Sequence, residues 1–204
     1  MIRILLSSLS IVIVASGAST LGCSSSSPSS PPGSAPMTEP STLAVNAQTP
    51  PTTGGAAVEA WVKDGSYKGW KCEPSVHPSR NPSPHGMNRI CSNDLTAAFT
   101  GTGERPLGSA GVKELYDATG KTIVGVAVYV KTKATTDGGS SWYWYERVPL
   151  ESEAPHDAKG VVADGLGASG PAKEICVGCH AGAGSDAAHT PTPGAFDQVY
   201  TQVK

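Results

Sequence analysis

The feature that most constrains this chain is a group of two cysteines and a histidine near its C-terminus, Cys176-Val177-Gly178-Cys179-His180. The pattern C-x-x-C-H is the attachment signature of c-type haem. Two thiols three positions apart on one helical turn can each add to a vinyl group of a porphyrin, and the following histidine can ligate the iron. We therefore expect one covalent haem c, attached through Cys176 and Cys179, with His180 as the iron ligand.

The same pattern has two other uses in proteins. A redox-active C-x-x-C pair normally stands in a thioredoxin-like βαβ unit, and half of a zinc site needs a second ligand pair at a finger-like spacing. The sequence contains neither signal, so haem attachment is the preferred interpretation and these two remain the alternatives.

The N-terminus predicts export. Arg3 precedes an apolar stretch from Ile4 to Ala18 that is too short to span a bilayer comfortably. Thr20-Leu21-Gly22-Cys23 then resembles a bacterial lipoprotein box, although Thr20 stands where the usual box has Leu. We expect residues 1–22 to be a lipoprotein-type signal peptide and Cys23 to be lipidated. An ordinary secretory signal, cut nearby, is the alternative.

Residues 23–55 are dominated by Ser, Pro, Thr and Gly. Such a segment buries too little apolar area to offset its conformational entropy, so it is expected to be a disordered tether. Residues 56–204 would then form one haem domain, held at the bacterial cell envelope. Because haem c is attached outside the cytoplasm, this location agrees with the haem motif.

Two cysteines remain after lipid and haem are assigned, Cys72 and Cys91. An even pair in an oxidising compartment predicts a disulfide, which would enclose the Pro-rich loop from Glu73 to Pro84. A pair of free thiols is the alternative.

Composition narrows the fold class. The net charge of −2 offers no electrostatic footprint for nucleic acid, and no second apolar stretch could cross a membrane. The 24 glycines and 17 prolines favour a loop-rich α+β domain over a helical bundle. Small electron-carrier cytochromes c are usually helical and carry C-x-x-C-H early, so its late position here predicts another architecture.

Local patterns predict mainly strands with a few short helices. Within residues 58–70 we expect a short helix followed by a turn at Asp64-Gly65. Further short helices are expected after the capping residue Asn93 and over 172–179. Strands are expected over 89–92, 111–117, 122–131 and 142–148. Residues 160–170 lack a period and are expected to be a loop, and residues 196–203 a closing helix or strand.

The predicted strand 122–131 has two unlike faces. Four valines, at alternate positions from Val124 to Val130, form an ordinary core face. Gly125, Ala127 and Tyr129 form the other, whose small centre admits either a flat porphyrin or a closely approaching backbone. In residues 142–148, two tryptophans likewise share one face and two tyrosines the other.

Several segments, in this order, resemble the cytochrome P-460 family of bacterial monohaem c-type proteins. The matching segments are Trp61…Tyr67…Trp70, His85-Gly86 followed by Arg89, Val112-Lys113-Glu114-Leu115-Tyr116, Trp142-Tyr143-Trp144, Cys176 to His180, and Asp197-Gln198-Val199-Tyr200. The resemblance implies a mainly antiparallel sheet with a few helices, haem c packed against the sheet, and a possible homodimer.

The resemblance also implies roles for two further residues. In hydroxylamine-oxidising members, a lysine in a V-K-E-L segment is joined covalently to the porphyrin, and Lys113 matches it. An arginine in the distal pocket is matched by Arg89. Relatives called cytochromes c′-beta share the fold, lack the oxidase activity and bind small gases.

One departure weakens the match to the oxidising members. Those proteins place a distal carboxylate in the strand that corresponds to residues 122–131, where this chain has Ala127. Hydroxylamine must lose protons as its electrons leave, so a proton acceptor is needed. Tyr129, His85 or Glu114 would have to take that role.

Three functions follow. The first is an oxidoreductase acting on hydroxylamine or nitric oxide and passing electrons to a periplasmic acceptor. The second is a gas-binding protein without turnover. The third is a plain electron carrier, whose sixth iron ligand would be Met87, His85, His77 or His156.

Overall fold

The computed structural model describes residues 49–80, 83–100, 103–183 and 196–204. The expected signal peptide, the lipidation site Cys23 and most of the expected tether lie outside these residues. The described structure begins within the range assigned to the tether: Pro50 is buried, and the backbone N–H of Gly55 donates to Asp164 at 2.7 Å. These residues therefore pack on the domain. Among the described residues, no helix has the length and apolar character needed to cross a membrane.

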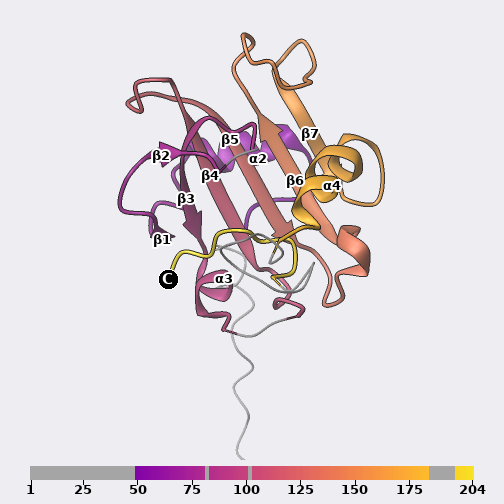
Figure 1. The fold of residues 1–204 in the computed structure, drawn as a ribbon. Helices are drawn as coiled ribbons and strands as arrows, with labels where there is room; N and C mark the ends of the chain where they lie inside the picture. The colour runs from indigo at the N-terminus through magenta and orange to yellow at the C-terminus, as the bar shows by residue number, and fades with distance from the viewer. Residues whose placement is uncertain (1–48, 81–82, 101–102, 184–195) are drawn as a thin grey trace, which may run out of the picture. The chain divides into compact units, whose positions relative to one another are not determined.

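The described residues form a seven-stranded antiparallel sheet with a few short helices (Figure 1). This confirms the expected α+β class. The strands are β1 (Lys71–Cys72), β2 (His77–Pro78), β3 (Met87–Ser92), β4 (Ala110–Tyr116), β5 (Ile123–Lys131), β6 (Trp142–Arg147) and β7 (Val161–Leu166). Their order is β1-β3-β4-β5-β6-β7, and β2 also pairs with β3. The helical segments are α2 (Gly55–Lys63), α3 (Asp94–Ala98), η1 (Asp137–Gly139), the π-helical η2 (Ala172–Val177) and α4 (Gly178–His180).

One face of the sheet packs against α2, which Figure 1 shows behind the strands. The valine face expected for β5 lies here, as Val126, Val128 and Val130 are all buried in this core. Tyr143 and Tyr145 of β6 join the same core, so the alternation expected for both strands is confirmed. Burial of these apolar side chains stabilises this layer.

The other face carries η2, α4 and the C-terminal residues. Trp142 and Trp144 of β6 pack here with Ala172, Cys176 and Val177 of η2. Figure 1 shows α4 in front of the sheet, near β6 and β7. The tryptophan face and the tyrosine face of β6 therefore contribute to two separate cores.

The small face of β5 has two different causes. A Cβ added to Gly125 would lie 2.5 Å from the carbonyl oxygen of Arg147, so glycine is required there by a closely approaching backbone. Ala127, two residues later, instead lines a cavity. The closely approaching backbone is thus confirmed at Gly125, and the porphyrin stays a prediction at Ala127.

Two sequence-based expectations are wrong. Residues 160–170 contain β7, which pairs with β6 from Tyr143 to Arg147. The hydrogen bonds to β6 stabilise this strand, and a local sequence pattern does not reveal such a partner. Residues 196–204 form neither a helix nor a strand. This segment is held instead by side-chain contacts such as that between Gln202 and the carbonyl of Ala97, at 3.0 Å.

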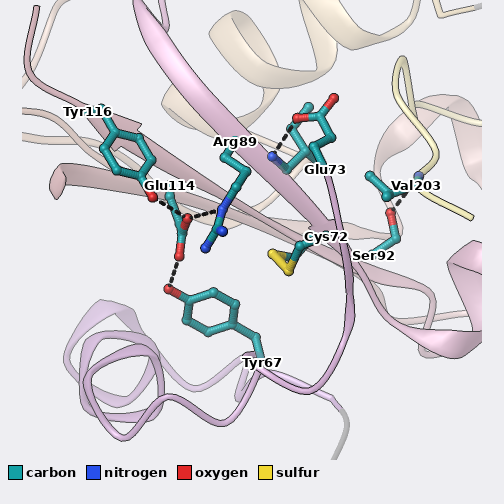
Figure 2. The surroundings of a disulfide bond; sticks show 10 residues. Tyr67, Cys72, Glu73, Arg89, Ser92, Glu114, Tyr116 and Val203 are labelled. Carbon is teal, nitrogen blue, oxygen red and sulfur yellow. Dashed lines mark hydrogen bonds and ion pairs between the residues drawn. A yellow bond between two sulfur atoms is a disulfide. The ribbon is translucent and has the colours of Figure 1, made fainter. Parts of the chain in front are cut away.

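The expected disulfide between Cys72 and Cys91 is present, and it joins β1 to β3 (Figure 2). Asn93 caps α3 as expected, its side chain accepting a hydrogen bond from the backbone N–H of Thr96 at 3.0 Å. The disulfide thus ties the edge strand β1 to β3.

We expect the double substitution Cys72→Ala and Cys91→Ala to lower the free energy of unfolding. The two cysteines are 19 residues apart, and a loop of that length predicts a loss of about 3 kcal/mol because the unfolded chain regains conformational entropy. Urea denaturation measures the change, and reducing agent added to the parent protein is the matched control. An unchanged denaturation midpoint in both cases would contradict a stabilising disulfide.

Candidate functional site

The C-x-x-C-H segment lies on the helical turn formed by η2 and α4. Cys176 and Val177 are buried against β6, whereas Cys179 is exposed. A Cβ added to either Gly139 or Gly167 would lie 2.5 Å from a methyl group of Val177. Glycine at both positions thus lets the helical turn pack closely on its surroundings.

Cys176 and Cys179 are free thiols and are not joined to each other. Burial raises the pKa of Cys176 to about 12, with smaller contributions from Glu146 and Cys179. Redox-active C-x-x-C pairs have a thiol whose pKa is lowered. Every strand pairing in the described residues is antiparallel, so they contain no thioredoxin-like βαβ unit.

His180 is held by the C-terminal segment. Its Nδ1 lies 2.7 Å from the carbonyl oxygen of Gln198, and because that oxygen only accepts, Nδ1 carries the proton. Burial lowers the pKa of His180 to about 3, and the positive charge of Lys113 acts in the same direction. The imidazole is therefore neutral and its Nε2 lone pair is available, which is the arrangement usual for a histidine that ligates a metal.

Two cavities lie beside this histidine, with volumes of about 170 and about 60 Å³. Both are lined by Cys179 and His180 and by three residues from other segments, His85, Lys113 and Tyr129. Cys176, Ala127, Trp144 and Glu146 line the smaller cavity. The three residues of the motif thus share cavity walls with the sheet.

A row of side chains crosses the sheet at this point. Lys113 on β4 is opposite Ala127 on β5, and Ala127 is opposite Glu146 on β6. Neighbouring strands are about 4.8 Å apart, so the backbones at Lys113 and Glu146 are separated by roughly 10 Å. The small Ala127 side chain between them leaves open space above the sheet.

Lys113 faces the cavities, as a haem-linked lysine would require. Burial lowers its pKa to about 8, and the nearby carboxylates of Glu146 and Glu73 oppose that shift. A lysine whose pKa is lowered in this way is partly uncharged near neutral pH, and the uncharged amine is a potential nucleophile. Its position differs from that of an ordinary strand lysine in solvent.

Arg89 does not line either cavity. It is the partner of Glu114 across β3 and β4, and its Nε donates to that carboxylate at 2.7 Å (Figure 2). Side chains alternate along a strand, so Arg89 and Glu114 point to the face that carries the disulfide, whereas Ile90 and Lys113 point to the cavities. The structure therefore gives neither Arg89 nor Glu114 access to the site. Arg80, which the sequence did not single out, lines the larger cavity.

Glu146 is the functional candidate that sequence reasoning missed. It is 5% exposed, and one carboxylate oxygen lies 3.0 Å from Nδ1 of His85. A signal existed in the sequence, since Glu146 continues the alternation of Trp142 and Trp144 and must share their face. A carboxylate is thus present beside Ala127, supplied by the next strand.

Of the four residues considered as a sixth iron ligand, two line a cavity and two do not. His77 and His85 line the larger cavity. Met87 and His156 line neither cavity. His77 is also bonded through Nε2 to Glu73 at 2.9 Å, so each of the two cavity histidines has a carboxylate partner.

One buried donor close to His180 lacks a partner. Within the described residues, the buried indole N–H of Trp144 has no hydrogen-bond partner, although its ring lies only 4.6 Å from that of His180. A polar group bound beside His180 would give this donor a partner. No group of three or more His, Cys, Asp or Glu residues in the described chain could hold a metal by itself. A single imidazole next to two free thiols fits a porphyrin-held iron.

No protein-family model matches the chain, and no curated protein sequence matches it either.

We expect Lys113 in the haem-free chain to react with amine-acylating reagents at a lower pH than an ordinary lysine. Burial disfavours the charged ammonium, so the reactive neutral amine should reach half its population near pH 8. An ordinary lysine reaches it near pH 10.4. Labelling followed by peptide mass analysis gives the profile, and Lys113→Arg identifies the peptide. A midpoint near 10.4 would show that Lys113 is solvated.

Proposed function

We propose that this protein is an exported monohaem c-type cytochrome that oxidises small nitrogen compounds. The observation that carries the proposal is the state of His180. Its Nδ1–H is bonded to Gln198, its ring is neutral, and it shares cavity walls with Cys179 and Lys113. Thioether bonds to Cys176 and Cys179 would hold the porphyrin, and His180 would ligate its iron.

The alternatives for the motif are less well supported. A raised pKa at Cys176 and a wholly antiparallel sheet are unlike a redox-active dithiol. A closed zinc site needs four ligands, and the described residues contain no cluster of even three.

Substrate oxidation needs both an electron sink and a proton acceptor. When bound, haem iron supplies the electron sink and a coordination position for a small molecule. Glu146 supplies a buried carboxylate that could accept a proton from hydroxylamine, and His85, whose Nδ1–H donates to that carboxylate at 3.0 Å, would hold it in position. Electrons removed from the substrate would pass to a periplasmic acceptor.

Positive charge in the same cavity favours this chemistry. Arg80 and Lys113 both line the larger cavity and would stabilise negative charge that develops on a deprotonating substrate. Arg80 thereby takes the role first assigned to Arg89. The resemblance to the cytochrome P-460 family implies another use of Lys113, a covalent link to the porphyrin, in which case Arg80 would supply the positive charge.

Two other functions remain candidates for specific reasons. A gas-binding protein like cytochrome c′-beta would use the same cavity without turnover. A six-coordinate electron carrier is favoured by His85, which lines both cavities and could reach the iron. The proposal also includes membrane attachment through Cys23, which lies outside the described residues, and assembly as a homodimer.

We expect the chain to carry one covalent haem when it is produced in a bacterium with cytochrome-maturation machinery. The mass of the protein should exceed that of the processed polypeptide by one haem, and its ferric spectrum should be high-spin. Cys176→Ser together with Cys179→Ser should abolish the colour, whereas Lys173→Ala, an exposed change on the same helix, should not. A colourless parent chain would refute the proposal, and a low-spin ferric spectrum would favour the electron carrier.

We expect Glu146→Gln to slow the reduction of the ferric protein by hydroxylamine by roughly 10²–10⁴-fold, the usual contribution of a positioned general base. The amide keeps the shape of the side chain but cannot accept the proton. Glu174→Gln, an exposed change on η2, is the matched control and should leave the rate unchanged. If the parent protein binds nitric oxide but is not reduced by hydroxylamine, the gas-binding function is correct.

A further inference from the structure

The segment 196–204 lacks regular secondary structure, yet it supplies the carbonyl that holds His180. The residue next to that carbonyl, Asp197, is only 3% exposed and is among the most densely bonded side chains in the described chain. Its Oδ2 accepts from Nζ of Lys131 at 2.6 Å and from the backbone N–H of Arg105 at 2.6 Å. Its Oδ1 accepts from Thr136 and, at 3.3 Å, from Nε1 of Trp142.

The partners of Asp197 come from the sheet and its loops, so they fix this residue relative to the rigid part of the fold. Lys131 ends β5 and its side chain is fully buried, with Asp197 as its ion-pair partner. A buried ammonium group needs such a partner, because an unpaired charge in the interior is strongly unfavourable. The ion pair therefore holds segment 196–204 at one position on the sheet.

The backbone at this position has an uncommon conformation. Asp197 has φ of 47° and Gln198 has φ of 68°, both in the left-handed region that residues other than glycine rarely adopt. Such a conformation persists only where surrounding contacts enforce it. Here the contacts to Asp197 enforce it, and the result is that the Gln198 carbonyl lies 2.7 Å from Nδ1 of His180.

We propose that Asp197 is a positioning residue, which acts through the Gln198 carbonyl to set the hydrogen bond on the proximal histidine. The inference rests on the proposed haem function. A hydrogen bond accepted from Nδ1–H increases the electron donation of the imidazole and fixes its orientation. The buried Lys131–Asp197 pair thus tunes the iron, although neither side chain lines the cavities.

The test compares the iron–histidine bond in the haem-loaded parent protein with that in Asp197→Asn. The amide has only one acceptor oxygen and cannot serve donors on both sides, so the Gln198 carbonyl should move away from His180. Resonance Raman spectroscopy of the reduced protein should then show a lower iron–histidine stretching frequency. The reduction potential should rise, because a weaker donor stabilises ferric iron less.

Glu114→Gln is the matched control. Glu114 is also a buried carboxylate with three donors, Arg89, Tyr67 and Tyr116 (Figure 2). Strand alternation places it on the opposite face of the sheet. The Glu114→Gln substitution should lower the unfolding temperature. It should leave the iron–histidine stretching frequency and the reduction potential unchanged. If the two variants change these readouts equally, or if Asp197→Asn changes neither, Asp197 has a structural role only.

A second variant covers the case in which Asp197→Asn does not fold. Asp197→Asn combined with Lys131→Met removes both buried charges, so no ammonium is left without a partner. The same downward shift in stretching frequency is expected, and an unshifted frequency would overturn the proposal. A parent chain without haem would overturn the proposed function as well, which distinguishes the two failures.

Discussion

The pairing register of β4, β5 and β6 is the constraint on which the rest of the site depends. It places Lys113, Ala127 and Glu146 in one row on one face, with the smallest side chain in the centre. A slip of one residue in any of these strands would turn its side chains to the opposite face. The buried valines of β5 and the aromatic residues of β6 prevent such a slip, because the slip would remove these side chains from the hydrophobic cores in which they are buried. The hydrophobic layer thus determines where the charged groups stand.

The two faces of the sheet divide the polar groups into two sets. On one face, Glu114 is saturated by Arg89 and two tyrosines and lies beside the disulfide. On the other, Lys113, Glu146 and His85 surround cavities next to the C-x-x-C-H turn. The first set satisfies its own hydrogen bonds and stabilises the edge of the fold. In the second set, His85 is bonded to Glu146, and both residues line cavity walls together with Lys113.

The C-terminal residues complete the site without forming an element of secondary structure. Their place is set by the Lys131–Asp197 ion pair and by contacts such as that of Val203 with Ser92, at 3.2 Å. Through Gln198 they contact the histidine of a motif that lies 18 residues earlier in the chain. The proximal side of the proposed haem is thus built by two segments, one helical and one irregular, that only the folded sheet brings together.

The sequence by itself determined the strands with clear alternation, the α+β class and the disulfide, because each depends on local spacing or on cysteine number. The faces of β5 and β6 followed from the two-residue period alone. Tertiary structure decided which polar residues meet. The order of segments along the chain suggested that Arg89 lies at the site. The alternation of side chains along β3 instead directs Arg89 to the opposite face of the sheet. Glu146 reaches the site because β6 pairs with β5, and β7 and the C-terminal segment took forms that only long-range partners could stabilise.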